Sequence, residues 1–580
     1  MLLTRRRIRR TCILVLAITL GLSLLTAPPS RIEIESLEYQ TGFESTSVSG
    51  AFHVHTNRSD GSLSVEEIAA IAADVGLSFV VFTDHGDGIE ESDLPAYHSG
   101  VLCIGSTEIS TDGGHYIAVD LPKTPYPLGG QVAGVVEDVE RLGGFGVIAH
   151  PGSKKSTFRW DNWDLKFDAM EWFNVDSEWR NEPLLRLVAS PIHYLLKPSE
   201  TIAQLLDRPV ENLLQYDRIS QLRNIVMLPG ADTHGAIPLP VLPDARLPIG
   251  GSSFYKNAFR AFTLRVEVNQ ELSGTPILDG QLIIDALRKG RAYTLIDALA
   301  SPGDLQFTAT SGNQLAHMGE RIATDTPVQL DVRVRMPPGG LVLLKQNGET
   351  VAKSNTNKLT YVSDSTSAVF RVEVLLPEIT SVTGIPWIMS NPIYIGEEFN
   401  RPENDSESAP IVIKSLFSDN ASAKTWQVEH EQHSRAAVNA TESIDGSELA
   451  LRYALSSEEQ DSPFAALVQN DLDTLSNYDR IRFSVRGDRP HRVSVQLRAS
   501  NSDRQELPRW QRSIYAGKEK REVVVRFKDM EPVGRSSSNL FDLNAVNTLL
   551  VVVDTVNTAP GSSGVIWLND VQLEGSTLPN

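Results

Sequence analysis

Short apolar runs alternate with amphipathic segments over about the first half of the chain. Runs of strand length, rich in β-branched and aromatic residues, occur at 51–55, 77–85, 101–110, 115–121, 145–151, 168–174 and 224–234. Apolar residues that recur every three or four positions predict helices at 64–76, 131–144 and 277–290. This alternation is typical of a parallel α/β barrel or sheet.

The predicted helix at 64–76 carries a marker at each end. Ser64 and Glu67 have the spacing of a capping box, in which each side chain accepts a hydrogen bond from the other residue's backbone. Gly76 follows the last apolar position and predicts the end of the helix.

After about residue 300 the apolar positions alternate with a period of two, which is typical of half-buried strands. We expect an immunoglobulin-like sandwich at 303–396, where "QNGE" marks a hairpin turn, and a polar linker at 397–410. Residues 411–580 form a second all-β region, and its end, "GVIWLNDVQLE", resembles the closing strands of galactose-binding-like jelly rolls and carbohydrate-binding modules. Trp426, Trp510 and Trp567 are the candidates for stacking on a sugar.

The first 30 residues have the composition of a targeting segment. "RRRIRR" is a basic stretch, and the uncharged apolar run "TCILVLAITLGLSLLTA" follows it directly. The segment is interpreted as a signal peptide or an N-terminal membrane anchor, which would place the rest of the chain in the periplasm or at the cell surface. Cys12 lies in this segment and Cys103 is the only other cysteine, so the exported part has no disulfide framework.

Charge and length restrict the class of protein. A chain of 580 residues is long enough for several domains. Its formal net charge of −20 argues against binding a nucleic-acid backbone as a main role, because such binding depends on a large basic surface.

Polar residues of metal-binding type stand at the ends of the predicted strands. His53 and His55 lie one residue apart and would point to the same face of a regular strand. Similar residues close or open the other runs, namely Asp84, His85, Glu108, His115, His150, Asp232 and His234. The carboxyl ends of barrel strands meet at one face, and burying so many imidazoles and carboxylates together would be costly without a cation. The pattern therefore predicts a metal centre with several ions.

Five motifs together resemble the PHP (polymerase and histidinol phosphatase) superfamily. They are "HVHTNRSDG", "FTDH", "EISTDGGH", "IAHPG" and "GADTHG", in this order. The resemblance implies a distorted (β/α)7 barrel over residues 48–300, with two or three metal ions at its C-terminal mouth. It also implies hydrolysis of phosphoric esters.

The resemblance assigns a ligand set to three ions. The first ion would be held by His53, His55, Glu108 and Asp232, the second by Glu108, His115 and His150, and the third by Asp60, His85 and His234. Glu108 would bridge the first two ions, and the reaction would depend on His53, His55, Glu108, Asp232 and His234. Imidazole and carboxylate ligands suit Zn²⁺, Mn²⁺ or Fe²⁺, and the sequence does not choose among them.

Basic residues near the motifs are candidates for holding the phosphate. Lys154 and Lys155 follow "HPG" directly, and Arg58 lies in the first loop. An insertion at about 158–222 contains Trp160, Trp163, Trp172 and Trp179, which would either line the substrate pocket or pack inside the insertion.

We therefore expect an extracytoplasmic metal-dependent phosphoesterase whose cluster activates water. Its partner would be a phosphorylated small molecule or an envelope glycan, and the N-terminal helix would anchor it to the membrane. Two alternatives remain: a metal-containing protein that binds an envelope glycan without turnover, and a hydrolase that acts on a bond other than a phosphoric ester.

Overall fold

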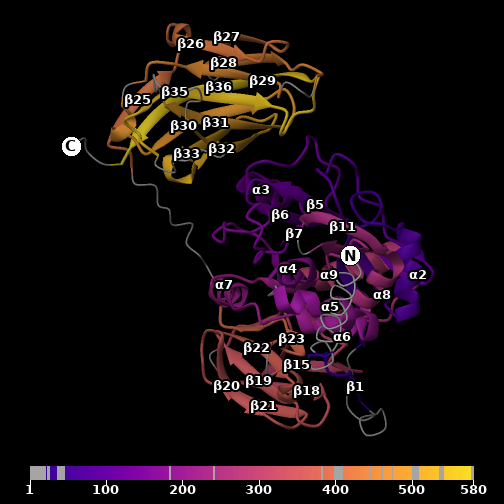
Figure 1. Cartoon of the computed structure of the whole chain (residues 1–580). Helices are drawn as coiled ribbons and strands as arrows, with labels where there is room; N and C mark the ends of the chain where they lie inside the picture. The colour runs from indigo at the N-terminus through magenta and orange to yellow at the C-terminus, as the bar shows by residue number, and fades with distance from the viewer. Residues whose placement is uncertain are drawn as a thin grey trace, which may run out of the picture. The chain divides into compact units, whose positions relative to one another are not determined.

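The computed structural model describes residues 21, 26–34, 46–181, 184–239, 242–324, 326–380, 383–397, 409–443, 446–458, 462–472, 474–499, 508–533 and 541–576. The chain forms two compact units. The first comprises Met1–Gly86, Ser92–Pro122 and Val139–Asn400, and the second comprises Asp87–Glu91, Lys123–Asp138 and Arg401–Asn580. All of the predicted metal ligands belong to the first unit. Figure 1 shows the chain with its helices and strands labelled.

Seven neighbouring strands of the first unit form a closed ring. In spatial order they are β2 (Thr46–Val54), β3 (Phe79–His85), β5 (Val101–Thr111), β6 (Gly114–Val119), β7 (Phe145–Ile148), β8 (Ala169–Asn174) and β9 (Val226–Gly230). The ring closes where the chain after β9 meets β2. There the backbone N–H of Ala231 donates to the carbonyl of Phe52 at 3.0 Å, and that of His55 donates to Thr233 at 3.1 Å.

One strand of the ring, β6, is antiparallel to its neighbours, whereas the sequence pattern predicts a parallel arrangement. The pairs β2–β3, β3–β5, β7–β8 and β8–β9 are parallel, whereas β6 is antiparallel to both β5 and β7. Only Asp112 and Gly113 separate β5 from β6. Such a short connection permits a hairpin but not the crossover that parallel strands require. The start of β6 therefore lies at the same rim of the ring as the ends of its parallel strands.

Helices cover the ring and form the insertion. They are α2 (Val65–Val75), α4 (Val175–Asn181), α5 (Leu184–Leu196), α6 (Pro198–Leu205), α7 (Val210–Ser220), α8 (Gly251–Ala261) and α9 (Pro276–Arg288), whereas α3 (Val132–Leu142) belongs in part to each unit. The expected capping box of α2 is present: Ser64 accepts from the Glu67 N–H, and Glu67 accepts from the Ser64 N–H. Gly76 ends the helix with φ 89°, a left-handed conformation that glycine adopts without strain.

The apolar side chains of the ring form one buried cluster with the inner face of α9. Phe52, Phe79, Ile104, Val147 and Leu228 come from five ring strands, and Ile283 and Leu287 come from α9. This packing holds the strands at fixed separations, so the rim above it is a rigid support for polar side chains.

Residues 300–397 form a β region that shares a sheet with the ring. One sheet contains β15 (Asp304–Ser311), β16 (Gln314–His317), β18 (Val328–Arg335) and β21 (Lys358–Ser363). The facing strands are β17 (Arg321–Ile322), β19 (Leu341–Gln346), β20 (Glu349–Ser354), β22 (Ala368–Leu375), β23 (Ile388–Ser390) and β24 (Ile393–Ile395); the short α10 (Pro377–Thr380) links β22 to β23. β23 pairs with β13 (Ala292–Leu295), which pairs with β12 (Thr263–Val268) and through it with β2. The ring and this region thus belong to one unit.

The remaining strands of the first unit are short or peripheral. β1 (Ile32–Glu33) pairs in parallel with β14 (Ala300–Ser301), β4 (Ala96–His98) pairs with β5, and β10 (Ala236–Leu239) pairs with β11 (Leu242–Gly250).

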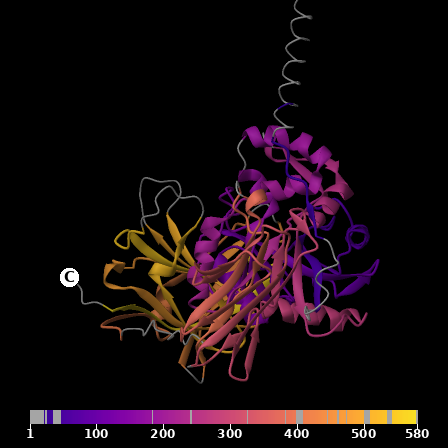
Figure 2. The same ribbon diagram turned by 90° about the horizontal axis from the view of Figure 1, so that it is seen from below.

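Residues 409–576 form a β-sandwich of two six-stranded sheets, coloured orange to yellow in Figures 1 and 2. One sheet contains β25 (Val412–Phe417), β27 (Arg435–Ser443), β28 (Gly446–Ala454), β30 (Arg480–Gly487), β33 (Arg521–Arg526) and β36 (Ser563–Gly575). The other contains β26 (Trp426–His430), β29 (Phe464–Gln469), β31 (His491–Ala499), β32 (Arg509–Ala516), β34 (Glu531–Pro532) and β35 (Val546–Asp554). The protein is therefore multidomain, with an α/β part followed by β-sandwich sheets.

Two of the tryptophans considered for sugar stacking belong to the core of this sandwich. Trp426 and Trp510 are buried, and Trp510 stacks on Phe541. Trp567 is partly exposed, and the Arg486 guanidinium lies 3.9 Å from its ring centroid. A ligand therefore cannot reach Trp426 and Trp510 in this structure.

The predicted leader and linker lie mostly outside the described residues, which omit 1–20, 22–25 and 398–408. Within the part of the chain that the structure describes, no helix is long and apolar enough to cross a membrane. The end of the predicted leader contacts the insertion, where Lys197 Nζ donates to the carbonyl of Pro28 at 2.9 Å and to Ser30 Oγ at 2.8 Å.

Candidate metal centre

The residues singled out at the strand ends lie together at the C-terminal rim of the ring. His53 lies on β2, His55 directly follows this strand, and His85 is the last residue of β3. Glu108 lies on β5 opposite His85. His115 reaches the same rim from the start of β6 because that strand is antiparallel. The described residues include three groups whose atoms could hold an ion: His53, His55 and Glu108; His85, Glu108 and His115; and His55, Asp60, His85 and His234.

The first group has the spacing of ligands that share one ion, and Asp232 lies beside two of its members. His53 Nε2 and His55 Nε2 are 3.1 Å apart, and Glu108 Oε2 lies 3.3 Å and 3.2 Å from them. Asp232 Oδ1 lies 3.4 Å and 3.5 Å from the same two nitrogens. Ligand atoms placed about 2.1 Å from a tetrahedrally coordinated ion are separated from one another by about 3.4 Å. The His53, His55 and Glu108 atoms therefore fit around one divalent ion, and the Asp232 carboxylate lies beside them.

Glu108 also contacts His115 and His150, and these three residues are called the second group below. The two oxygens of Glu108 face different imidazoles. Oε2 faces His53 and His55, as described above, whereas Oε1 lies 2.9 Å from His115 Nδ1 and 3.0 Å from His150 Nε2. The Glu108 side chain is almost fully buried, so the carboxylate has no bulk water to compensate its charge. The arrangement suits a carboxylate that bridges two ions.

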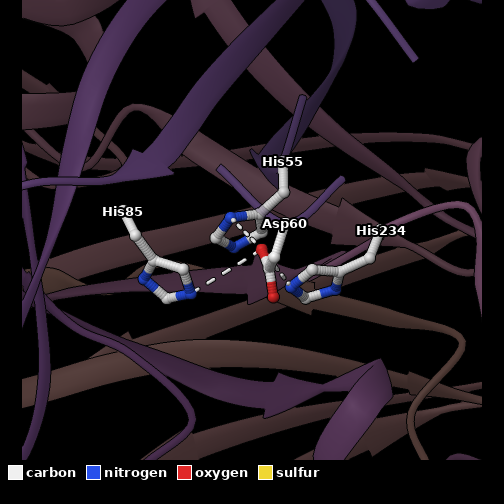
Figure 3. Close-up of side chains that lie close together, drawn as sticks. All are labelled: His55, Asp60, His85 and His234. Atoms are coloured by element: carbon white, nitrogen blue, oxygen red, sulfur yellow. Dashed lines mark ion pairs between the residues drawn. The ribbon is translucent and has the colours of Figure 1, made fainter. Parts of the chain in front are cut away.

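The third group surrounds Asp60 (Figure 3). Asp60 Oδ1 lies 3.2 Å from His234 Nε2, 3.5 Å from His55 Nδ1 and 3.8 Å from His85 Nε2. His55 thus faces the first group through Nε2 and the third through Nδ1. His85 is shared as well, since its Nδ1 lies 3.4 Å from Glu108 Oε2.

Three of the histidines are oriented by acceptors that bind the ring nitrogen pointing away from the centre. His53 Nδ1 donates to Glu171 Oε1 at 2.6 Å, and His234 Nδ1 donates to the Asp232 carbonyl at 2.9 Å. His150 Nδ1 donates to the Phe158 carbonyl at 3.2 Å. In each ring this contact leaves the Nε2 lone pair directed at the centre, which is the arrangement typical of metal-bound histidine.

The charges of the centre are strongly coupled. Burial lowers the pKa of His53, but the carboxylates of Glu171, Asp232 and Glu108 outweigh burial and raise this pKa well above its usual value. Burial also opposes the charged form of His55, and hydrogen bonds to Asp232 and Glu108 raise its pKa to about 9. The imidazoles in turn hold the pKa of Asp232 well below its usual value, although burial raises it. The carboxylates therefore create a field that favours positive charge at this rim.

Three residues of the centre have left-handed backbone conformations that are uncommon for side chains with a Cβ. They are His53 with φ 65°, His150 with φ 32° and Asp232 with φ 43°. His53 also forms a bulge, because the register between β2 and β3 shifts between Phe52 and Val54. Such conformations cost on the order of 1–3 kcal/mol each and are concentrated at functional sites. The bulge, together with strand alternation, sets the directions of His53 and His55.

Two further carboxylates support the centre, Glu171 and Asp84, and neither was assigned to an ion. Glu171 lies on β8, is fully buried, and accepts from His53, from the His150 N–H at 2.6 Å and from Asn174 Nδ2 at 2.9 Å. The sequence contains one sign of it, a glutamate in the middle of the apolar run "DAMEWFN".

Asp84, at the end of β3, holds the loop that carries Asp60. It accepts from the Thr56 N–H at 2.8 Å, from Thr56 Oγ1 at 2.7 Å and from Ser59 Oγ at 2.5 Å. Asp84 thus orients the loop.

The basic residues proposed to hold a phosphate have different surroundings. Arg58 forms an ion pair with Asp93 at the surface. The Nζ of Lys155 lies 4.0 Å from the centroid of the Phe158 ring, and that ring packs against His115 and His150. Lys154 is exposed beside it. Lys155 therefore lies next to the second group, whereas Arg58 already has an acidic partner.

The tryptophans of the insertion also differ. Trp160 and Trp172 are fully buried and pack inside the structure, with Trp172 Nε1 donating to Thr294 Oγ1 at 3.0 Å. Trp163 packs edge-on against Phe167. Trp179, on α4, is partly exposed and lines a cavity beside the centre.

Comparisons with known proteins concern the sandwich at the C-terminal end. No family model and no curated protein sequence matches the chain. Among solved structures, a family 11 carbohydrate-binding module from Clostridium thermocellum, in complex with a β-1,3-1,4-mixed-linked tetrasaccharide, is similar over 30% of this chain and 100% of that chain, with 12% identity and a TM-score of 0.26. A family 30 carbohydrate-binding module of a Clostridium thermocellum cellulosomal cellulase is similar over 29% of this chain and 100% of that chain, with 10% identity and a TM-score of 0.23.

Proposed function

We propose that the protein is a metal-dependent hydrolase of phosphoric esters of the PHP type. The observation that carries this proposal is the set of donor atoms from His53, His55 and Glu108, which lie 3.1–3.3 Å from one another as ligands of one ion do. Asp232 Oδ1 lies 3.4 Å and 3.5 Å from the two imidazole nitrogens of this set. The motifs in the sequence and the ring of seven strands, with the donors at its C-terminal rim, support the same function.

The donor set fits two or three divalent ions of the Zn²⁺, Mn²⁺ or Fe²⁺ class. Such ions would supply Lewis-acid polarisation of the phosphoryl group and activation of water. The chain's own residues hold the donors in place: Glu171 fixes His53 and the backbone at His150, and Asp84 fixes the loop before Asp60. Lys155, beside Phe158, would attract the anionic ester to the second group.

The test combines metal analysis with a turnover screen. The full chain would be loaded separately with Zn²⁺, Mn²⁺ and Fe²⁺ and assayed on phosphomonoesters, phosphodiesters and phosphorylated glycans. We expect two or three ions per chain and turnover of at least one ester, lost on chelation and restored by the same ion. Protein that binds no divalent ion would refute the proposal.

The same screen separates the alternative functions. Metal-loaded protein that binds envelope glycans but hydrolyses none of the esters would indicate a binding protein. Release of an acid from carboxylic esters or amides, with phosphoric esters left intact, would indicate a hydrolase of another bond.

We also propose an extracytoplasmic location. The support is the basic stretch followed by an apolar run at the start of the sequence. A protease added to intact spheroplasts should digest the sandwich at 409–576, whereas digestion only after lysis would place the protein inside the cell.

A further inference from the structure

A cavity of about 230 Å³ lies directly beside the metal centre. Its walls come from the insertion helices α4, α5 and α6 and from α8, and they include Asp232 and His234 of the centre. The apolar lining is formed by Val175, Trp179, Tyr194, Ile202, Leu205 and Phe254. Because two donors of the centre belong to the wall, a ligand held at the centre would extend directly into this space.

The polar side chains of the cavity already have partners within the protein. Asp176 accepts from Arg180 Nε at 2.9 Å, and the Tyr194 hydroxyl accepts from Asn257 Nδ2 at 3.2 Å. Thr201 Oγ1 donates to the Lys197 carbonyl at 2.7 Å. A sugar or a charged group placed here would lose its hydration and gain few hydrogen bonds, which is costly. An apolar group would meet no such cost.

The volume indicates the size of the group. A cavity of about 150 Å³ lined by apolar side chains is large enough to bind benzene. A space of about 230 Å³ would hold a larger group, such as a bicyclic aromatic or an alkyl chain of several carbons.

We propose that this cavity binds the apolar alcohol portion, aliphatic or aromatic, of the ester whose phosphoryl group lies at the metal centre. The inference rests on the proposed function and specifies its substrate class. The insertion helices then serve substrate selection, while the rim of the ring serves the reaction.

The experiment measures kcat/KM of the metal-loaded full chain for the n-alkyl phosphates from methyl to octyl, for 1-naphthyl phosphate and for glucose 6-phosphate. We expect kcat/KM to rise with chain length by up to about fourfold per methylene until the cavity is full. A higher kcat/KM for octyl phosphate than for 1-naphthyl phosphate would indicate that the cavity binds an aliphatic group, and the opposite order would indicate an aromatic group. Equal values from methyl to octyl, with 1-naphthyl phosphate no better, would overturn the inference.

A variant pair locates the effect. Phe254→Asp places a charge in the cavity wall and should lower the ratio of kcat/KM for octyl to methyl phosphate at least tenfold. Leu278→Asp, at an exposed position on α9, should leave that ratio unchanged. If both variants keep the wild-type ratio, the apolar group binds elsewhere and the inference is wrong.

A binding measurement separates failure of this inference from failure of the proposed function. Octylphosphonate and methylphosphonate, which have no ester bond, would be titrated into the metal-loaded protein by calorimetry. Tight binding of octylphosphonate that Phe254→Asp abolishes, without turnover of any ester, would support the cavity and refute the phosphoesterase. Turnover of esters with equal binding of both phosphonates would refute only the cavity.

Discussion

His53 Nδ1 lies 2.6 Å from Glu171 Oε1, so that a buried carboxylate on β8 fixes an imidazole on β2. The same carboxylate accepts from the backbone N–H of His150 at 2.6 Å. One side chain thus positions donors of both the first and the second group. Its substitution should affect metal binding although it does not face the ions.

We expect Glu171→Gln to weaken metal binding by about 10- to 100-fold, because an amide accepts the two N–H groups less well than a carboxylate. Competition with a coloured chelator measures the affinity. Glu211→Gln, an exposed glutamate on α7, is the matched control and should retain wild-type affinity. Equal affinity of the two variants would show that Glu171 does not orient the ligands.

Gly230→Ala should mimic the loss of Glu171. A Cβ at this position would lie 2.2 Å from Glu171 Oε1 and would displace the carboxylate. We therefore expect a similar loss of metal affinity, and in the double variant with Glu171→Gln the two effects should not add, because both act through one contact. Fully additive losses would assign the effect of Gly230 to another cause.

Glu108→Ala should reduce turnover to background and lower the metal content, since both oxygens of this carboxylate face imidazoles of different groups. Elemental analysis and the ester assay measure the two effects. Far-ultraviolet circular dichroism should show that the β-sandwich sheets remain folded. Wild-type activity at normal metal content would contradict the bridging role.

Asp84→Asn should act mainly on the third group, because Asp84 holds Thr56 and Ser59 in the loop that carries Asp60. We expect a loss of up to one ion per chain, with the ions bound by His53 and His115 retained. Asp93→Asn, which breaks the surface pair with Arg58, is the control and should keep the wild-type stoichiometry. Loss of all ions would indicate that the loop supports the whole centre.

The stability of the first unit should depend on pH through Glu267 on β12. Burial raises the pKa of this carboxyl from 4.5 to about 7, although Arg291 lowers it. The folded state therefore binds the proton more tightly than the unfolded state, and stability falls as the pH rises from about 4.5 through about 7.

Glu267→Gln removes this ionisation and should stabilise the protein at pH 8 by up to about 3 kcal/mol. The gain should vanish below about pH 4.5, where the wild-type side chain is protonated in both states. Urea unfolding at several pH values measures it, with the exposed Glu271→Gln as control. A gain that does not change with pH would assign the stabilisation to packing.

Much of the first unit could be predicted from the sequence because its patterns are local. The capping box of α2 depends on residues three positions apart, and each ring strand is a continuous apolar run. The gathering of His53, Glu108 and Asp232 follows from their places at the ends of strands, since a closed ring brings those ends together.

Other features depend on neighbours that are distant in the sequence. Glu171 is a glutamate within an apolar run, and only the folded chain shows that His53 and the His150 backbone bind it. The bulge at His53 is set by pairing with β3, which strand alternation alone does not reveal. The turn residues Asp112 and Gly113 indicate a hairpin and therefore an antiparallel β6. The general alternation of strands and helices favoured a parallel sheet instead.

The pairing of β13 with β23 limits how far the polypeptide can be shortened from its C-terminal end. Asn391, just after β23, bonds both the N–H and the carbonyl of Met227 on β9, and Trp387 donates to the Ala300 carbonyl at 3.0 Å. Ending the chain at residue 300 would remove these partners and leave β13 with an unpaired hydrogen-bonding edge, which favours aggregation. A shortened version for crystallisation or screening should therefore not end before residue 397, so that the neighbouring β region is kept.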